Sequence, residues 1–392
     1  MRFPLFLALA GALALAGCIG PVALHQAVLG YDETIIRLES EMLLLNIARS
    51  HHTLPGHFTV TSSIAATFDY RANAGFTGSF FEPPGANSYA LTLGTSAAEN
   101  PTLSIIPIQG EEFTTRILTP LDETKLAFLI FQGAPIDMVL RLMADGIEVQ
   151  ERDGTFERFI LNWPTHPEEY EEFRRRALHL AWLNGERNLF VGTLGFEETL
   201  RARLPAAPSA GELVQTLEKG YRWRRLGGDG EYELTRTVTG RVAITNYDPR
   251  ALGNAERQAL NARAAATPRN FVLVDIRPGH PGGDFPLFGG IKLRSLNAII
   301  AFVAAGIGRT PEYDVAPDPR TGAAGRNPGA ALAVEETDGQ PAGRPLSVAF
   351  AGKAYSVPNT AWDREAFRLL SQLFQMTVTD VSQAGVPVTI SK

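Results

Sequence analysis

Residues 57–70 read HFTVTSSIAATFDY, and residues 88–96 read SYALTLGTS. In both stretches apolar residues alternate with small or hydroxyl-bearing residues, a pattern typical of strands with one buried face. The turn-rich segment EPPGANS (82–88) separates them, and LSIIPI (103–108) ends the block. We therefore predict a long β-hairpin or a small meander between residues 57 and 108.

Helical patterns flank this β block. Residues 32–50 carry apolar residues at three- and four-residue steps, which predicts a helix. Short helices interrupted by Pro and Gly are expected over residues 110–143. Later strands and helices alternate without strict βαβ order. We predict an α+β fold: an N-terminal helix, the hairpin or meander, a helical segment, then mixed strands and helices.

The composition excludes several classes of protein. The 392 residues carry a formal net charge of −6, which argues against a broad surface for nucleic acid. A single cysteine excludes an intrachain disulfide framework and any Cys-rich zinc or iron–sulfur site. We expect no nucleic-acid partner and no cofactor.

The N-terminus, MRFPLFLALAGALALAGC (1–18), has a basic start and an apolar run that is too short for a membrane span. Its end, LAGC (15–18), resembles the lipobox of bacterial lipoproteins, in which the signal is cut before a cysteine that becomes lipidated. The resemblance implies a signal peptide over residues 1–17 and acylation of Cys18, palmitate included. By resemblance to Gram-negative lipoproteins, Ile19 rather than Asp after the cysteine favours an outer-membrane anchor that faces the periplasm. The alternative is a plain signal peptide that contains a cysteine.

Composition divides the rest of the chain into four parts. We predict an N-terminal part over residues 18–150 that holds the first helix, the β block and the short helices. An α+β domain follows over residues 151–310. Residues 311–345, rich in Pro and Gly, are expected to form a flexible loop, and residues 346–392 to complete the domain as a strand–helix–strand unit.

Three segments carry a resemblance to an uncharacterised family of Gram-negative outer-membrane lipoproteins. They are LLLNIAR (43–49), PTLSIIPIQGEEFTTRILTPL (101–121) and, near the C-terminus, AFRLLSQLFQM (366–376). The resemblance implies an envelope lipoprotein, and it carries over no active site because these motifs are mostly core-like.

The densest histidine cluster is HHTLPGH (51–57). The imidazoles of His51, His52 and His57 could bind zinc, nickel or copper. No carboxylate in the same stretch completes a ligand set, and histidines near a helix C-terminus are also favoured by the helix dipole. These residues are therefore candidate metal ligands, and no bound metal is predicted.

The loop DIRPGHPGGDFP (275–286) follows a predicted strand and holds Asp275, Arg277, His280 and Asp284. An Asp and a His placed together could act as an acid–base pair. The alternative is a Gly- and Pro-rich turn whose polar side chains bind the backbone. The sequence contains no G-x-S-x-G, S-x-x-K or H-E-x-x-H motif, so no nucleophile signature supports catalysis.

Three functions remain open at this point. The first is a non-enzymatic, lipid-anchored structural or assembly component of an envelope complex. The second is a subunit of an oligomeric outer-membrane export channel, in which hairpins over residues 57–95 join into a barrel. The third is a periplasmic hydrolase that uses Asp275 and His280. The expected partners are the outer membrane, reached through the acyl chains, and envelope proteins, with further copies of the chain in the second case.

The length of the β stretches favours the channel, because outer-membrane strands need about 9–11 residues. The first residues of the block argue against it. Thr59, Thr61 and Ser63 alternate with Phe58, Val60 and Ser62, so neither face is strongly apolar there. An edge hairpin of a soluble domain explains the same residues.

Overall fold

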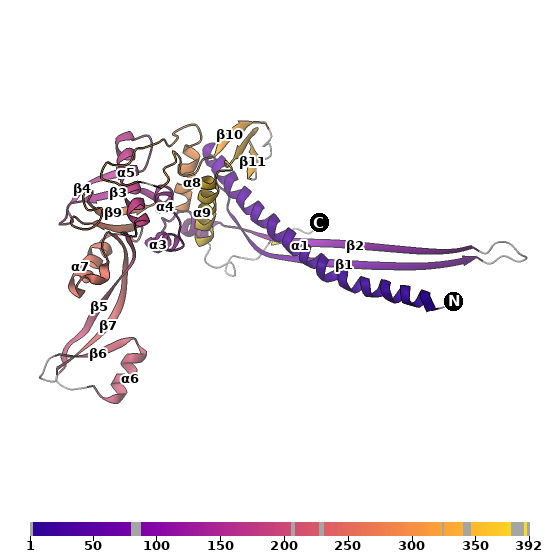
Figure 1. Cartoon of the computed structure of the whole chain (residues 1–392), viewed down its shortest axis with the longest axis horizontal. Coiled ribbons are helices and arrows are strands. Elements are labelled where there is room, and N and C mark those ends of the chain that lie inside the picture. Colours follow the sequence, from indigo (N-terminus) through magenta and orange to yellow (C-terminus); the bar gives the residue numbers. More distant parts are fainter. Residues whose placement is uncertain are drawn as a thin grey trace, which may run out of the picture. The chain divides into compact units, whose positions relative to one another are not determined.

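The structure is a computed structural model. It describes residues 3–79, 88–204, 208–226, 231–323, 325–339, 346–377 and 388–389. The chain divides into two compact units, and Figure 1 labels their helices and strands. The first comprises Met1–Ile35, His57–Gly110 and Val378–Lys392, and the second comprises Ile36–Gly56 and Glu111–Thr377.

The first unit holds the start of helix α1 (Phe3–His51) and a long antiparallel hairpin of β1 (Thr59–Ser79) and β2 (Ser88–Pro107). A short strand, β13 (Val388–Thr389), pairs with β2. The α+β fold with an N-terminal helix and a hairpin is therefore confirmed. None of the helices in the described part of the chain combines the length and apolar character that a membrane span requires.

The second unit is built on a mixed sheet in the order β4-β3-β9-β8-β7-β5, with β6 also paired to β7. Only β7 and β8 pair in parallel among these strands. The strands are β3 (Ala144–Gln150), β4 (Phe156–Leu161), β5 (Phe190–Leu204), β6 (Tyr221–Leu226), β7 (Glu231–Thr245), β8 (Phe271–Ile276) and β9 (Leu287–Leu293).

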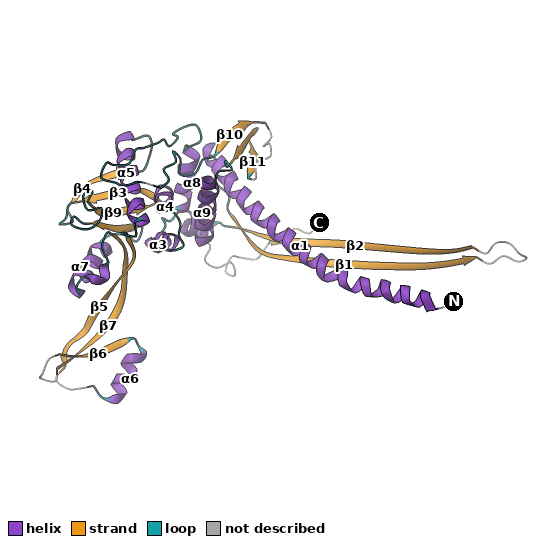
Figure 2. Cartoon of the chain, in the orientation of Figure 1, coloured by secondary structure: helices purple, strands orange, loops and turns teal. Residues whose placement is uncertain are grey.

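The second unit contains further helices and helical turns, several of which pack on this sheet or on one another (Figure 2). They are α2 (Gly110–Phe113), the π-helical turn η1 (Thr114–Leu118), α3 (Glu123–Phe131), α4 (Ile136–Met143), α5 (Pro167–Gly185), α6 (Ala210–Glu218), the 3₁₀ turn η2 (Pro249–Ala251), α7 (Asn254–Ala265), α8 (Leu296–Ala305) and α9 (Ala361–Thr377). A small sheet has the order β10 (Glu335–Asp338), β12 (Lys353–Ser356) and β11 (Ser347–Phe350).

Local sequence explains several helix starts. The Asp122 side chain accepts hydrogen bonds from the backbone N–H groups of Thr124 and Lys125 and so caps α3. Ser209 and Glu212 form the reciprocal capping box at the start of α6 that the sequence indicates. Such caps satisfy N–H groups that have no partner within the helix.

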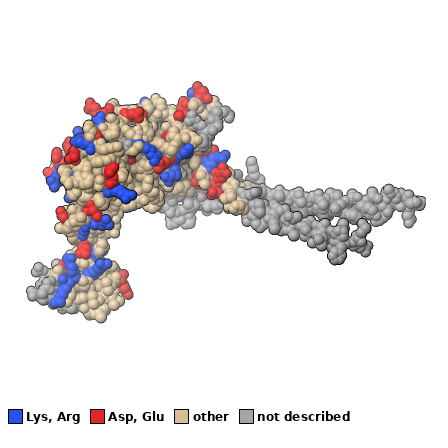
Figure 3. All heavy atoms as spheres, viewed as in Figure 1, with Lys and Arg blue, Asp and Glu red and all other residues tan. Residues whose placement is uncertain are grey.

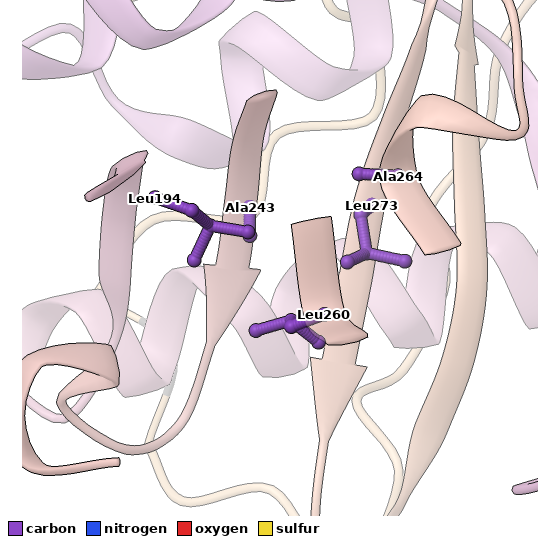
Figure 4. Close-up of a cluster of buried hydrophobic side chains, with 5 residues drawn as sticks. All are labelled: Leu194, Ala243, Leu260, Ala264 and Leu273. Carbon is purple, nitrogen blue, oxygen red and sulfur yellow. The ribbon is translucent and has the colours of Figure 1, made fainter. Parts of the chain in front are cut away.

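Helix α7 covers β5, β7 and β8. A buried cluster lies between them (Figure 4), made of Leu194, Ala243, Leu260, Ala264 and Leu273. Apolar burial of this kind contributes about 25 cal/mol per Å². The cluster therefore fixes α7 on the sheet.

Strand β7 runs continuously through Gly240. The glycine does not make a turn. A Cβ atom at Gly240 would overlap the Asn261 side chain of α7, whose Oδ1 accepts a hydrogen bond from the Arg241 N–H at 2.8 Å. The residue is small because a helix approaches the backbone there.

A buried ion pair lies between α4 and the Pro- and Gly-rich segment predicted as a flexible loop. Arg141 donates from Nε and Nη2 to Glu312 Oε1, at 3.2 and 2.9 Å. Its Nη1 also donates to the Pro328 carbonyl at 2.8 Å. Glu312 further accepts hydrogen bonds from the Tyr170 hydroxyl at 2.9 Å and the Ala331 N–H at 2.6 Å. Part of the segment is thus fastened to α4 and α5.

Asp137, one turn before Arg141 on α4, is also buried. Neither of its carboxylate oxygens has a hydrogen-bond partner among the described residues, and Arg141 Nη1 lies 3.6 Å away. Burial raises the pKa of Asp137 above its ordinary value, against the lowering effect of Arg141. The carboxyl group is therefore biased toward its neutral form.

Candidate functional site

The hairpin of β1 and β2 is the most distinctive feature of the chain. Its strands pair in antiparallel register from Thr59 opposite Pro107 to Ser79 opposite Ser88. At about 3.3 Å per residue, such strands extend for roughly 65–70 Å. Among the described residues, β1 pairs only with β2, and β2 pairs otherwise only with β13, at Ser104 and Ile105.

One face of the hairpin, called here the apolar face, begins at the pair Ile64 and Leu103. Residues directly opposite each other in an antiparallel pair lie on the same face, and alternate residues follow along each strand. The register thus places on this face Ile64, Ala66, Phe68, Tyr70, Ala72, Ala74, Phe76 and Gly78 of β1 with Leu103, Pro101, Glu99, Ala97, Thr95, Leu93, Leu91 and Tyr89 of β2.

The other face, called the polar face, has a different composition. It carries Ser63, Ala65, Thr67, Asp69, Arg71, Asn73, Gly75, Thr77 and Ser79 of β1 with Ser104, Thr102, Asn100, Ala98, Ser96, Gly94, Thr92, Ala90 and Ser88 of β2. Hydroxyl, amide and small residues dominate, so the hairpin is amphipathic over most of its length.

A β-bulge explains why the first residues of the block conceal this pattern. The register shifts between Thr61 and Ser63, and such a shift moves the following residues to the opposite face. Before the bulge, the apolar pair Val60 and Ile106 lies on the polar face, and both residues are buried. The alternation of apolar and polar residues that distinguishes the two faces therefore starts at Ile64.

A hairpin of this length has two unsatisfied needs. An isolated two-stranded ribbon is marginally stable at best in water. Among the described residues, the outer edge of β1 beyond Thr59 and the outer edge of β2 away from Ser104 and Ile105 pair with no further strand, and such edges favour pairing with other chains. Pairing of both edges with further strands would meet both needs. The hairpin is therefore suited to assembly.

Two of the candidate metal ligands, His51 and His52, have protein partners in the second unit. His51 Nε2 lies 3.3 Å from Glu336 Oε2, and His52 Nε2 lies 2.6 Å from the Tyr355 hydroxyl. Tyr355 in turn donates to Glu336 Oε2 at 2.8 Å. Burial and the Glu336 carboxylate raise the pKa of Tyr355 above its ordinary value. The network fastens the end of α1 to the sheet of β10 and β12.

His57 belongs to the first unit, so no common site with the other two histidines is described. Among the described residues, no group of three or more His, Cys, Asp or Glu side chains is arranged to hold a metal ion. Cys18, the predicted lipidation site, falls within α1, and its side chain lies outside those that the structure describes.

The loop that holds the candidate catalytic residues begins at the end of β8, where Asp275 is the last residue but one of the strand. Asp275 is buried, and its Oδ2 accepts hydrogen bonds from the Tyr247 hydroxyl at 2.6 Å and from Arg277 Nη2 at 2.7 Å. Burial, together with the bond to Asp275, raises the pKa of Tyr247. Asp275 therefore links the end of β7 to the loop.

The other predicted members of this loop do not complete an acid–base pair. The exposed His280 packs its ring beside Tyr247, with 5.2 Å between ring centroids. No hydrogen bond of the described residues joins it to Asp275. Asp284 is exposed, and its backbone carbonyl accepts a hydrogen bond from Arg320. The geometry favours the turn that the sequence left as the alternative.

Two surface hollows lie elsewhere in the second unit. One, of about 480 Å³, is lined by residues such as Phe131 and Phe190, and the other, of about 520 Å³, by His51 and Glu336 among others. The candidate catalytic residues Asp275, His280 and Asp284 line neither hollow, so neither hollow supports a hydrolase site.

Strands β5, β6 and β7 extend from the central sheet as an arm that carries α6. Figure 3 shows Lys and Arg residues over this arm. Arg224 pairs with Glu233 and, at 3.3 Å, with Glu197, and Arg236 pairs with Glu198 at 2.8 Å. Acidic partners thus offset the positive charge of Arg224 and Arg236.

No protein-family model matches the sequence, and searches of the curated proteins and of the solved structures return no similar chain. The resemblance to outer-membrane lipoproteins therefore stays a prediction. The case for a function rests on the residues themselves.

Proposed function

We propose that this chain is a lipid-anchored, non-enzymatic outer-membrane component whose hairpins, one from each of several copies, pair edge to edge into a closed transmembrane channel. The observation that carries this proposal is the separation of an apolar from a polar face along the paired residues 64–79 and 88–103. Membrane barrels require that alternation, apolar toward lipid and polar toward the lumen.

The open edges support an assembly rather than a single hairpin in the membrane. Hydrocarbon offers no hydrogen bonds, so every backbone group inside it needs a protein partner. One hairpin cannot satisfy its own outer edges. A ring of hairpins satisfies all of them and has no edge left.

The composition of the polar face supports an open lumen. Barrels of eight strands are filled by their own side chains, whereas barrels of about 16 strands enclose water. Two strands per chain then imply about eight copies or more. The predicted acyl anchor at Cys18 would hold each copy at the membrane while the ring assembles.

The first test is the mass of the acylated full-length protein in a mild detergent, measured by light scattering with the detergent contribution subtracted. We expect one species of about eight or more copies. A monomer, or a complex with other proteins that contains one copy, would refute the ring and favour a purely structural envelope component.

The second test is ion conductance in planar bilayers. Asn73→Arg places a positive charge on the polar face of every copy and should shift ion selectivity toward anions. Gln215→Arg makes the same charge change on the exposed surface of α6, and it should leave selectivity unaltered. Equal selectivity in both variants, or no conductance in the parent protein, would contradict the channel.

A further inference from the structure

The two halves of the hairpin differ in the charge and proline content of the apolar face, which decides how deep each half can lie in a membrane. This inference rests on the channel proposed above and concerns which part of the hairpin meets lipid. On the apolar face, the half nearer the strand ends Thr59 and Pro107 contains Glu99, opposite Phe68, and Pro101, opposite Ala66. The half that begins at Tyr70 and Ala97 contains neither charge nor proline on that face.

Glu99 and Pro101 are both poorly suited to hydrocarbon. A charged residue on the lipid face of a barrel is destabilising, most of all near the middle of the membrane. Proline has no N–H to donate to the neighbouring strand, and lipid cannot satisfy the carbonyl left without a partner. Both residues therefore mark a section of β2 that stays outside the hydrocarbon.

The length of the remaining section fits a membrane. From Tyr70 to Gly78 on β1, and from Tyr89 to Ala97 on β2, each strand contributes nine residues, which extend about 30 Å. At a tilt of about 40°, this length covers roughly 23 Å, close to the apolar band of about 25 Å in outer-membrane barrels.

Aromatic residues lie at both ends of this section. Tyr70 occupies the end next to Glu99, and Phe76 and Tyr89 occupy the other end of the same face. Ala97 lies opposite Tyr70 and Leu91 opposite Phe76, and the two pairs between them are Ala72 with Thr95 and Ala74 with Leu93. Girdles of aromatic residues at the two interfaces flank the lipid-facing band of known barrels.

We infer that residues 70–78 and 89–97 span the hydrocarbon, and that residues 59–69 and 98–107 extend the channel outside it. The partner of the apolar face over residues 70–78 and 89–97 is lipid acyl chains. The charges on the polar face, Asp69 and Arg71, then lie at the mouth where the channel leaves the membrane.

The test compares Ala74→Cys with Ala66→Cys, two positions on the same face of the same strand. Each variant carries an environment-sensitive fluorophore and is inserted as the assembled, acylated protein into phosphatidylethanolamine–phosphatidylglycerol vesicles that contain lipid brominated on its acyl chains. The parent chain, whose single cysteine is Cys18, gives the background labelling. We expect quenching at position 74 and none at position 66.

Equal quenching at both positions, or quenching at position 66 alone, would overturn the depth while leaving the channel intact. No quenching at either position in a protein that still forms conducting rings would overturn the lipid-facing assignment. A monomeric protein would instead overturn the channel itself. As a second comparison, Ala74→Arg should abolish bilayer conductance, and Ala66→Arg should retain it.

Discussion

Replacement of Glu312 by Gln tests how the buried network stabilises the second unit. Arg141 is fully buried and the Glu312 side chain is 7% exposed, so the substitution leaves a buried guanidinium without its nearest carboxylate partner. Breaking such a pair costs about 3–5 kcal/mol. Gln retains one acceptor oxygen but turns an NH₂ group toward Arg141 or the Ala331 N–H, which removes further charge-assisted hydrogen bonds.

The assay is urea unfolding of the full-length protein in detergent, followed by tryptophan fluorescence. Domains have a total stability of about 5–15 kcal/mol, so the expected loss would lower the urea midpoint clearly. Trypsin provides a local readout, because Arg320 and Arg326 lie in the segment that Glu312 fastens. Cleavage there should precede cleavage elsewhere in the Glu312→Gln protein.

Glu365→Gln is the matched control. Glu365 pairs with Arg326 at 3.4 Å, and the arginine side chain is 59% exposed, so the pair is worth less than about 1 kcal/mol. If Glu312→Gln and Glu365→Gln shift the midpoint equally, or if trypsin cleaves the segment at the parent rate, the reasoning about the buried pair is wrong.

Three further substitutions have definite expected outcomes. Asp137→Asn should gain stability relative to the parent as pH rises above about 4. Burial raises the pKa of Asp137 from 3.8, so the folded parent holds a proton that the unfolded chain releases. A difference between the urea midpoints of the two proteins that stays constant from about pH 4 to about pH 8 would contradict this. Gly289→Ala should lower the free energy of unfolding by about 3 kcal/mol or more, since Gly289 has φ +141° and a Cβ there would overlap a backbone carbonyl of β3. The control is Gly195→Ala, where a Cβ would meet no atom within 4 Å, and it should lower the stability far less in the same unfolding assay. Tyr247→Phe should cost about 1–3 kcal/mol, because it removes a donor to the buried carboxylate of Asp275, and an unchanged thermal midpoint would argue against that bond.

Local patterns predicted the elements whose own residues dictate them. The alternation after His57 predicted the hairpin, and Ser209 with Glu212 predicted the start of α6 because a capping box is a local interaction. The alternation of residue types that defines the two faces of the hairpin can also be read in the sequence. It was obscured because the pattern changes face at the bulge between Thr61 and Ser63, and a bulge depends on pairing with the other strand.

Elements that depend on distant contacts were not predicted. Strand β5 and helix α7 stabilise each other through Leu194 and Leu260, which lie far apart in the chain. Glu312 lies in a segment of low periodicity, and its partner Arg141 comes from α4. Likewise, nothing local indicates that Asp275 bonds to Tyr247 rather than to the nearby His280.

The continuity of β7 has a mechanical consequence. The strand pairs with β6 near its start, at Glu231–Arg236, and with β8 near its end, at Ala243–Thr245. Tension applied along the strand from its start therefore reaches the ladder between β7 and β8 directly, through the covalent backbone. The two strands pair in parallel, and the hydrogen bonds of a parallel ladder are evenly spaced and slant across the strands. Such tension therefore loads several of them in shear at once. The arm is therefore stiff along its strands, and a force applied at its tip is transmitted to the middle of the sheet.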